Sequence, residues 1–520
     1  MCGIPCGIVT LVIGVAFVIT STIVGYVVIP DIIEDRVIDE MTLIDDTIQM
    51  ERFKAVPFAL NFTIRFFNIS NVDDVLAGGV PIVNEVGPYT YKLYQTRDVE
   101  EMEGDIIKYR RLENFEFDPV ASFPNTEDDI VTITNVAYHA VLQMAQSMFP
   151  ALMALLSTAL SGVFGQNNSP VIRARVRDLL FDGVPICQNP GLFGEVACIQ
   201  IRGFADNVQN MVLQEDGSLT FTFLAYKDNK PSNEYVAHRG LEDPLELGKI
   251  ITYNNASYLS YWVYDEVPDG DDEPGICNMI NGTDSGIFPP FVDRDRSIFA
   301  INTDICRSVE LRYQYDTEYE GIPVVRYSAN EWFLDNDEGC FCLNVTKASG
   351  HNRENGCLLR GAAELYSCVG AFLVLSYPHF LYADFTYRNG LLGMNPVEDN
   401  HRIFVDLEPL TGTVIRAAKR AQFNIFARPV PSIGPTQNLR TTLMPVFWIE
   451  ESMSLPKEFV EELTDKLLST LHLINILLPI AVALSCLVVV IGIAIIVRYA
   501  LLKKYDDGIL SSSPGRSSAK

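Results

Sequence analysis

Two long apolar segments, one near each end of the chain, constrain its fold more than any other feature. Residues 6–30 carry no charged side chain, and residues 474–497 are likewise uncharged. A helix rises about 1.5 Å per residue and the hydrocarbon core of a bilayer is about 30 Å thick, so either segment is long enough to cross a membrane. The first segment lacks the basic start and the small-residue cleavage site of a signal peptide. We therefore expect two transmembrane helices.

The charges beside these segments predict their orientation. Arg498, Lys503 and Lys504 follow the second segment, and basic residues flank the cytoplasmic side of a span. The mostly acidic stretch after the first segment suits the opposite side. We expect a plasma-membrane protein with both termini cytoplasmic, with a lysosomal or endosomal membrane as the alternative. The predicted order is cytoplasmic residues 1–5, a transmembrane helix at 6–30, an ectodomain at 31–473, a second transmembrane helix at 474–497 and a cytoplasmic tail at 498–520.

A third apolar stretch, residues 141–160, is also free of charged side chains. It is a poor span because Pro150 interrupts it and several polar side chains are dispersed through it. The surrounding residues 136–165 predict two helices joined near Pro150, since proline ends or kinks a helix. Two interpretations remain open, a helix pair buried in the ectodomain core and an exposed patch that contacts lipid. The lipid-contact candidates are Met144, Met148, Phe149 and Met153, because methionine gives an adaptable apolar surface.

Glycosylation acceptors and cysteines place both sides of this stretch in one compartment. Acceptors of the N-x-S/T type occur before it and after it, which favours a single lumenal or extracellular loop. An even number of cysteines between the two spans favours disulfides in an oxidising compartment. The acceptors are Asn61, Asn68, Asn167, Asn255, Asn281 and Asn344. The cysteines are Cys187, Cys198, Cys277, Cys306, Cys340, Cys342, Cys357 and Cys368.

Two further clusters contain residue types that can bind metal ions. Cys340, Cys342, His351, Cys357 and Cys368 have the residue types of a zinc site, but their spacing matches no common zinc ribbon and an oxidising location disfavours thiolates. The stretch VPDGDDEPG at 267–275 lacks the regular alternation of calcium ligands, which favours a solvated acidic loop. We expect no metal and no cofactor.

Two cysteines lie at the cytoplasmic mouth of the first span. Cys2 and Cys6 are candidates for reversible palmitoylation, with unmodified thiols as the alternative.

Composition and motifs narrow the functional classes. The net charge of −27 argues against a nucleic-acid partner, which needs a basic footprint. Segments such as VTITNV, SLTFTFLAY, IPVVRY and HRIFVDLEPL alternate with the period of half-buried strands. No nucleophile elbow, zinc-protease, P-loop or dinucleotide motif is present. An enzyme, for instance a lipolytic one, is therefore the weaker hypothesis.

An ordered series of motifs covers nearly the whole chain. It runs FFNISNVDDV and NEVGPYTYKLY, then from residue 277 CNMINGTDSGIFPPF, TDICRSV, YEGIPVVRY, GCFCLN, SYPHFLYAD, GMNPVEDNH, VDLEPLTGTVIRAAKRAQFNI and LMPVFWIEE. This series resembles the class B scavenger receptor family, which includes fatty-acid and lipoprotein receptors, a lysosomal integral membrane protein and insect sensory neuron membrane proteins. The similarity is weakest across residues 136–165.

The resemblance implies a fold and a set of disulfides. It implies a membrane-anchored, β-dominated α+β protein, with an antiparallel β-barrel-like core, an apical helical cluster at 136–165 and an internal tunnel. It implies the pairs Cys277–Cys340, Cys306–Cys368 and Cys342–Cys357, as in the fatty-acid receptor branch. Cys187 and Cys198 are left over and are expected to pair with each other.

The resemblance also implies a function. Fatty acids, sterols, lipoproteins or lipids of apoptotic cells would bind at the apex, and lipid would pass through the tunnel to the membrane. The alternatives are a lysosomal sorting receptor, for which the tail offers only a loose DDGIL signal, and a sensory co-receptor for hydrophobic odorants. A protein ligand at the apical helices and a homo-oligomer are further partners to test.

Three arginines follow the apical stretch. Arg173, Arg175 and Arg177 are candidates for holding a carboxylate head group at the entrance. The alternative is a helix with a solvated basic face.

Overall fold

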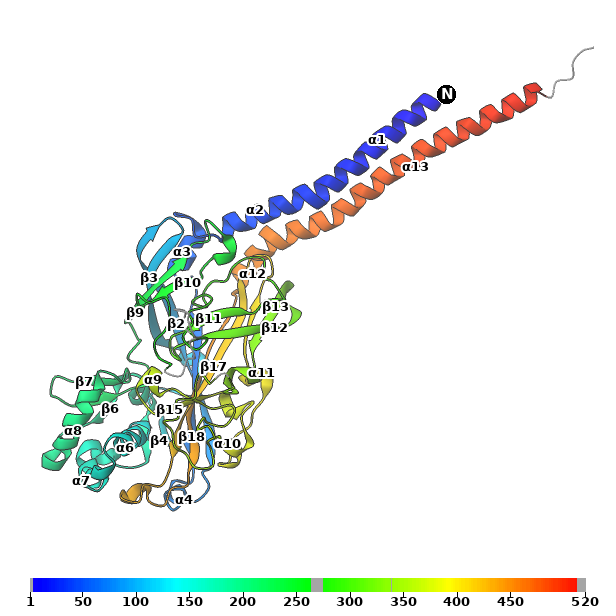
Figure 1. Ribbon diagram of the computed structural model, residues 1–520. Helices are drawn as coiled ribbons and strands as arrows, with labels where there is room; N and C mark the ends of the chain where they lie inside the picture. Colours follow the sequence, from blue (N-terminus) through cyan, green and yellow to red (C-terminus); the bar gives the residue numbers. More distant parts are fainter. Residues whose placement is uncertain (1–2, 263–274, 338, 512–520) are drawn as a thin grey trace, which may run out of the picture. The chain divides into compact units, whose positions relative to one another are not determined.

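The chain divides into two compact units in the computed structural model, which describes residues 3–262, 275–337 and 339–511 (Figure 1). The first, here called the membrane unit, comprises the N-terminal residues up to Glu40 and the C-terminal residues from Pro456. The second, here called the ectodomain, runs from Met41 to Leu455. The predicted bounds 31–473 refer to the ends of the apolar segments, beyond which both terminal helices continue.

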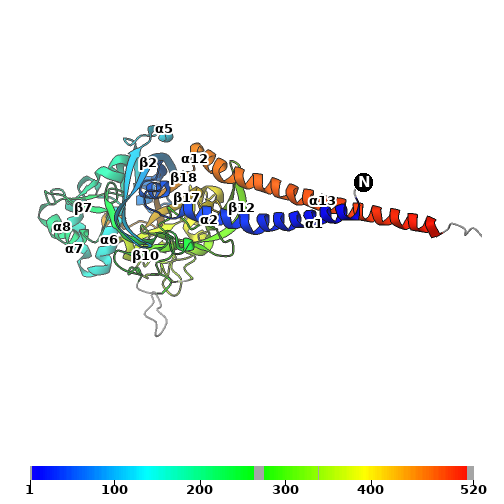
Figure 2. The same cartoon turned by 90° about the horizontal axis from the view of Figure 1, so that it is seen from above.

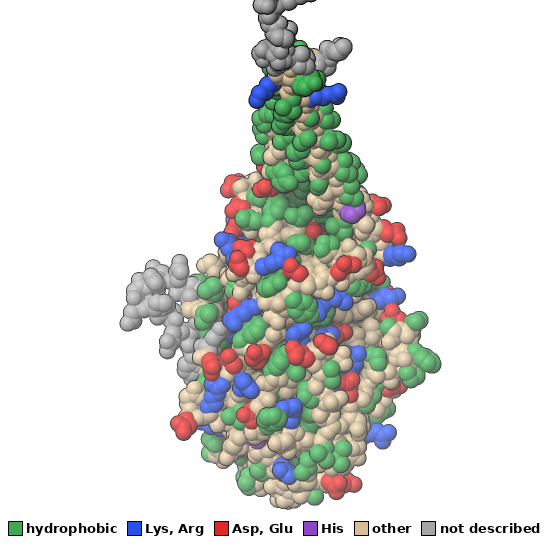
Figure 3. All heavy atoms as spheres, turned by 90° about the vertical axis from the view of Figure 1, so that its right-hand side faces the viewer, with side chains coloured by type: hydrophobic (Ala, Val, Ile, Leu, Met, Phe, Trp, Pro, Cys, Tyr) green, Lys and Arg blue, Asp and Glu red, His purple; other side chains and the backbone are tan. Residues whose placement is uncertain are grey.

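The membrane unit contains two long helical segments, as predicted. The N-terminal segment consists of α1 (Ile4–Ile23), the π-helical turn η1 (Val24–Val28) and α2 (Ile29–Met41). The C-terminal segment consists of α12 (Lys457–Leu463), η9 (Thr464–Leu468) and α13 (Ser469–Ser511). Both are long and apolar enough to cross a membrane. Figure 3 shows them covered with apolar side chains, with basic side chains near the end of the apolar region.

Glycines bring the two helices of the membrane unit into close contact. A Cβ atom added at Gly14 of α1 would lie 2.8 Å from the backbone nitrogen of Val489, and one at Gly492 of α13 would lie 2.7 Å from that of Leu11. Small residues allow such close backbone approach between helices in a bilayer, where packing replaces the hydrophobic effect. Any larger side chain at either position would force α1 and α13 apart.

A 13-stranded antiparallel sheet forms the core of the ectodomain, which confirms the predicted β-dominated fold. The alternation of apolar residues in β1 (Leu60–Ile69) places Phe62, Ile64 and Phe66 in the core, each at most 1% exposed. The main path of the sheet is β10 (Ile250–Tyr253), β9 (Pro231–His238), β3 (Ile106–Phe117), β2 (Val83–Glu103), β1, β18 (Thr442–Ser454), β17 (Val414–Ala427), β16 (Ile403–Leu407), β13 (Ile322–Ala329), β12 (Arg307–Tyr319) and β11 (Ile298–Asn302), with β15 (Leu373–Ser376) on β17 and β14 (Ala363–Glu364) on β15.

The first and last strands of the ectodomain lie side by side at the centre of this sheet. β1 pairs with β18 in an antiparallel register that places Ile64 opposite Ile449 and Phe66 opposite Phe447. The strands of the N-terminal half and those of the C-terminal half therefore meet along this single pairing.

A helical cluster lies on one side of the sheet (Figures 1 and 2). It comprises α6 (Val136–Met148), the short 3-10 helix η2 (Pro150–Leu152), α7 (Met153–Phe164) and α8 (Gly191–Ala205). The chain bends by 118° between α6 and the following helix. Asn135 begins α6 by accepting a hydrogen bond from the backbone N–H of Tyr138, and Pro150 begins the next turn.

The position of α6 answers the question raised by the third apolar stretch. Its first half is buried, and the Gln143 side chain donates a hydrogen bond to the carbonyl oxygen of Phe426 in β17. The stretch is thus a bent helix pair in which α6 packs on the sheet, while α7 packs mainly on α8 and is partly exposed.

Candidate functional site

The helical cluster encloses an open apolar groove of about 360 Å³. α6, α7 and α8 form its walls, and Gln200 is the single lining residue among them with a polar side chain. The lining residues are Ala140, Val141, Met144, Ala145, Phe149, Leu152, Leu155, Leu156, Ala159, Phe193, Val196, Ala197, Gln200, Ile201, Phe204, Val208, Met211, Gly370 and Ala371. The composition of this groove is suited to an apolar ligand and offers almost nothing to a charged group.

Two of the four predicted lipid-contact residues line this groove and two do not. Met144 and Phe149 line it. Met153 is buried, at 9% exposure, and Met148 is 45% exposed without lining the groove. The helix α8, a wall of the groove, was not predicted as part of the site. Its apolar residues at helical spacing could have indicated it: Leu192, Phe193, Val196 and Ile199, all exposed.

The three arginines do not line the groove. They lie on and just after the strand β5 (Val171–Arg175), away from the lining of the groove. Arg175 pairs with Asp128, Asp178 and Asp182, and Arg177 pairs with Glu127 and Asp182. Carboxylates therefore already neutralise two of the three candidate cations.

A second hollow, a cavity of about 490 Å³ that is partly open to solvent, lies within the ectodomain. Both halves of the chain contribute to its walls, including Phe62 of β1, Phe288, Leu375 of β15 and Phe423 of β17. Its lining also includes charged side chains, which the groove lacks.

Several charges of the cavity form ion pairs, although the exposed Lys230 on its wall is in none of the ion pairs found among the described residues. The Lys227 Nζ lies 3.1 Å from Asp304 and 3.4 Å from Glu113, while Arg111 pairs with Glu113 at 2.9 Å. Burial lowers the pKa of Lys227, but the carboxylates of Asp304 and Glu113 outweigh burial and hold that pKa well above its usual value. The lysine is therefore a stable cation whose charge is balanced by its neighbours.

Lys419 and Glu451 form another such pair on the cavity wall, with 2.8 Å between Nζ and Oε1. Burial raises the pKa of Glu451, but Lys419 reverses this and lowers it overall. These groups supply hydrogen-bonding atoms without a large local excess of charge.

The groove and the cavity share a thin wall. Val208 lines the groove while its neighbour Gln209 lines the cavity. On the other side of the wall Cys368 lines the cavity, whereas Gly370 and Ala371 line the groove. Two short chain segments therefore separate the two hollows.

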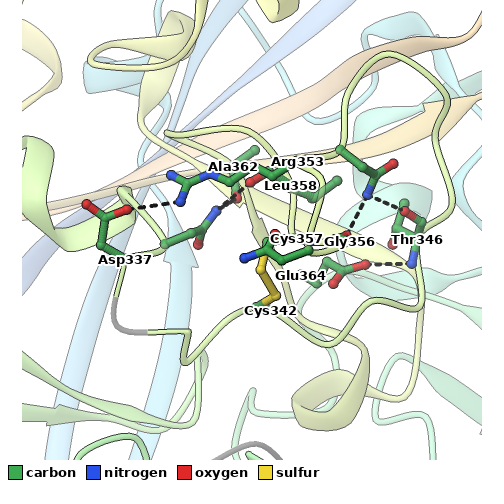
Figure 4. The surroundings of a disulfide bond; sticks show 12 residues. Asp337, Cys342, Thr346, Arg353, Gly356, Cys357, Leu358, Ala362 and Glu364 are labelled. Atoms are coloured by element: carbon green, nitrogen blue, oxygen red, sulfur yellow. Dashed lines mark hydrogen bonds and ion pairs between the residues drawn. A yellow bond between two sulfur atoms is a disulfide. The ribbon is translucent and has the colours of Figure 1, made fainter.

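Four disulfides cross-link the ectodomain, and they join the pairs that the resemblance implied. Because the cysteines of the zinc hypothesis are oxidised in these bonds, their thiolates are not available to a metal. Figure 4 shows the loop closed by Cys342 and Cys357, where the Arg353 guanidinium pairs with Asp337 and the backbone N–H of Thr346 donates to Glu364. The bonds are Cys187–Cys198, Cys277–Cys340, Cys306–Cys368 and Cys342–Cys357.

The remaining sequence candidates are located as follows. Among the described residues no group of three metal-ligating side chains is found, and residues 267–274 of the acidic loop lie outside them.

Cys6 is disulfide-bonded, so its palmitoylation requires reduction, and Cys2 lies outside the described residues. Of the glycosylation acceptors, Asn61, Asn255 and Asn344 are exposed, and Asn68, Asn167 and Asn281 are half-buried.

Comparison with known proteins gives consistent results along the chain. A family model described as the CD36 family matches residues 12–496. Sensory neuron membrane protein 2 of Drosophila melanogaster is 33% identical over an alignment covering 91% of this chain and 95% of the relative. Sensory neuron membrane protein 1 of Bombyx mori is 31% identical, covering 87% of this chain and 84% of the relative.

Proposed function

The chain belongs to the CD36 family, the class B scavenger receptors that its motifs resembled, and from that membership we propose that its ectodomain takes up lipid and passes it to the membrane. Lipid would bind in the groove between α6, α7 and α8, cross into the cavity and leave toward the bilayer. The observation that carries this proposal is the open apolar groove directly beside a second, larger cavity.

Lipid binding and transfer along apolar walls need no catalytic group. Each methylene moved out of water contributes about 0.8 kcal/mol, so an acyl chain of ordinary length is held strongly by apolar walls. The groove presents only one polar side chain to such a ligand. Fatty acids, sterols, and the lipids of lipoproteins or apoptotic cells all have the apolar portion that this surface requires.

The cavity favours ligands with an uncharged polar head. Arg111, Lys227 and Lys419 are each paired with a carboxylate. A free carboxylate on the ligand would have to compete with those partners, whereas a hydroxyl, aldehyde or ester needs only a hydrogen bond. We therefore infer that fatty alcohols and esters bind in the cavity more tightly than fatty acids of equal length.

Native mass spectrometry of the glycosylated full chain, purified from cells, tests the proposal. We expect co-purified lipid in the unmodified chain and its loss from Ala197→Trp, which fills the groove with an indole. Ala154→Trp is the matched control, because Ala154 is exposed on α7 and does not line the groove. Equal lipid content in both variants would contradict the proposal. An empty chain that captures one soluble hydrolase would instead indicate a sorting receptor.

The similar proteins favour one second candidate function. Sensory neuron membrane proteins of several insects match the chain over most of its length, which suggests a co-receptor that delivers hydrophobic odorants to a receptor channel. Transcript mapping distinguishes this role, since it requires expression in sensory tissue. A general distribution would leave lipid uptake as the function.

We also propose that both termini are cytoplasmic, that the protein resides at the plasma membrane and that the six acceptor asparagines carry glycans. The basic residues after the second span and the acceptors on both sides of α6 and α7 support this arrangement. A shift in mass after glycosidase treatment would test the glycans.

A further inference from the structure

We propose that the wall between the groove and the cavity is a gate, formed by the turn Asn207–Gln209 on one side and the segment Tyr366–Ala371 on the other. The inference rests on the proposed function, because a gate has a purpose only if a ligand passes from one hollow to the other. It adds to that function the place where passage is controlled.

The gate is closed in the structure by contact between two backbones. A Cβ atom added at Gly370 would lie 2.3 Å from the carbonyl oxygen of Asn207 and 3.3 Å from a methyl group of Val208. The absence of a side chain at Gly370 is what lets the two segments touch. Gly370 also has a φ of +71°, a left-handed conformation that glycine adopts without strain, as it ends the single-turn helix α9 (Tyr366–Val369).

One side of the gate is fixed to the ectodomain core. The disulfide Cys306–Cys368 ties α9 to the loop before β12. The backbone N–H of Leu365 donates to the carbonyl oxygen of Leu373, and β15, which begins at Leu373, is hydrogen-bonded to β17 of the large sheet. This side is therefore held by a covalent bond and by sheet pairing.

The other side continues a helix of the groove. The N–H groups of Asn207 and Val208 donate to the carbonyl oxygens of Phe204 and Ala205 at the end of α8, so the turn is a direct extension of that helix. Its far end is held at Asn210, whose side chain donates to the carbonyl oxygens of Thr222 and Phe223. The disulfide Cys187–Cys198 ties the middle of α8 to the residue after β6 (Val184–Ile186), so the part of α8 that can shift is its end beyond Cys198. A shift of that end would move the turn about the Asn210 attachment while the α9 side stays in place.

A ligand in the groove touches both sides of the gate. Val208 and Met211 line the groove from the turn, and Gly370 and Ala371 line it from the fixed side. α8 itself has a solvent-exposed apolar face and packs mainly on α7, where the backbones of Gly162 and Gly194 meet closely. Hydrocarbon that fills the groove would thus press α8 away from α9 and open the path to Gln209 and Cys368.

Photolabelling of the full chain in lipid nanodiscs tests the gate. The probe is a long-chain fatty alcohol with a diazirine on its chain, and labelled peptides of groove and cavity are distinguished by mass spectrometry. A Val208→Cys and Ala371→Cys double variant, made with Cys486→Ser, is joined across the gate by a short thiol cross-linker. The Cys486→Ser chain, which keeps Val208 and Ala371 and is treated with the same cross-linker, is the matched control.

We expect the cross-linked double variant to keep labelling of groove peptides and to lose labelling of cavity peptides, while the Cys486→Ser control labels both sets. In the unmodified chain, groove labelling should precede cavity labelling over time, a measurement that depends on no substitution. Undiminished cavity labelling after cross-linking, or simultaneous labelling of both sets in the unmodified chain, would overturn the gate and leave lipid binding intact. No label at either set in the unmodified chain would overturn the proposed function itself.

Discussion

The buried ion pair between Arg97 of β2 and Asp284 gives the sharpest test of how the ectodomain is stabilised. The side chains are 4% and 1% exposed, and the Arg97 Nε and Nη2 atoms each lie 2.8 Å from Asp284 Oδ2. Arg97 also donates to the carbonyl oxygen of Phe53. Removing it as Arg97→Met would leave a buried carboxylate with two remaining donors, the Tyr109 hydroxyl at 3.1 Å and the Gly286 N–H at 2.9 Å.

Loss of one partner from a buried ion pair lowers the unfolding free energy by about 3 to 5 kcal/mol. Because two hydrogen-bond donors to Asp284 remain, we expect a loss of about 3 kcal/mol for Arg97→Met. The ectodomain spans Met41 to Leu455. For roughly 400 residues that unfold together, an unfolding entropy of about 2.1 cal/mol/K per residue converts this loss into a decrease in Tm of about 4 °C. Thermal unfolding of the full chain in nanodiscs, followed by tryptophan fluorescence, measures it.

The pH dependence has a definite sign. Burial raises the pKa of Asp284, but Arg97 and Arg111 outweigh burial and hold that pKa well below its usual value. The pair therefore stabilises the fold fully above the unfolded-state pKa of about 3.9. This contribution decreases below that pH and is lost as the pH falls through the lower folded-state pKa of Asp284. In Arg97→Met the carboxyl group of Asp284 keeps only Arg111 as a cationic neighbour and protonates more readily, so the difference in Tm from the unmodified chain should shrink as the pH is lowered from 7 toward 4.

Two variants serve as controls for this reasoning. Arg294→Met removes a surface pair with Asp316, whose side chains are 45% and 55% exposed, and should cost at most about 1 kcal/mol. Adding Asp284→Asn to Arg97→Met removes the stranded charge and should restore part of the lost stability. Equal effects of Arg97→Met and Arg294→Met, or no recovery in the double variant, would refute the argument.

Three further outcomes are expected. Gly14→Ile should separate the two transmembrane helices, measured as reduced energy transfer between labels at the two termini, and unchanged transfer would refute the close contact. Removing the disulfide Cys306–Cys368, whose cysteines are 62 residues apart, should lower the unfolding free energy by about 4 kcal/mol. Removing Cys187–Cys198, at a separation of 11, should lower it by about 3 kcal/mol. Denaturant unfolding measures both losses, and the reverse order would count against the loop-entropy account. A tag at either terminus should be inaccessible to antibody on intact cells, and surface staining would reverse the orientation.

Features set by local pattern could be predicted from the sequence. The two spans and the break at Pro150 follow from apolar length and from the conformational limits of proline, and both lie where expected. The segment SLTFTFLAY was predicted as one strand, but β8 covers only Leu219–Phe221, after which the chain turns to place Lys227 on the cavity wall. Alternation alone does not show where tertiary contacts end a strand.

The site was only partly predictable because its parts meet across long sequence distances. Met144 and Phe149 were identified from local composition, whereas Gly370 and Ala371 reach the same groove from a segment more than 200 residues later. The partners of Arg175 include Asp128, on a loop before β4 (Ile130–Thr134), and no local pattern indicates that this charge is neutralised. Neighbours across such separations become visible only in the folded chain.

The central pairing of β1 with β18 has a consequence for biosynthesis. The last strand of the sheet is synthesised about 400 residues after the first, which at 5–20 residues per second is a delay of roughly 20 to 80 s. Throughout that interval one edge of β1 is without its native partner and exposes backbone donors and acceptors to the compartment in which the chain emerges. Maturation of this receptor should therefore depend on lumenal chaperones, and a chain that ends before Thr442 should be retained and degraded.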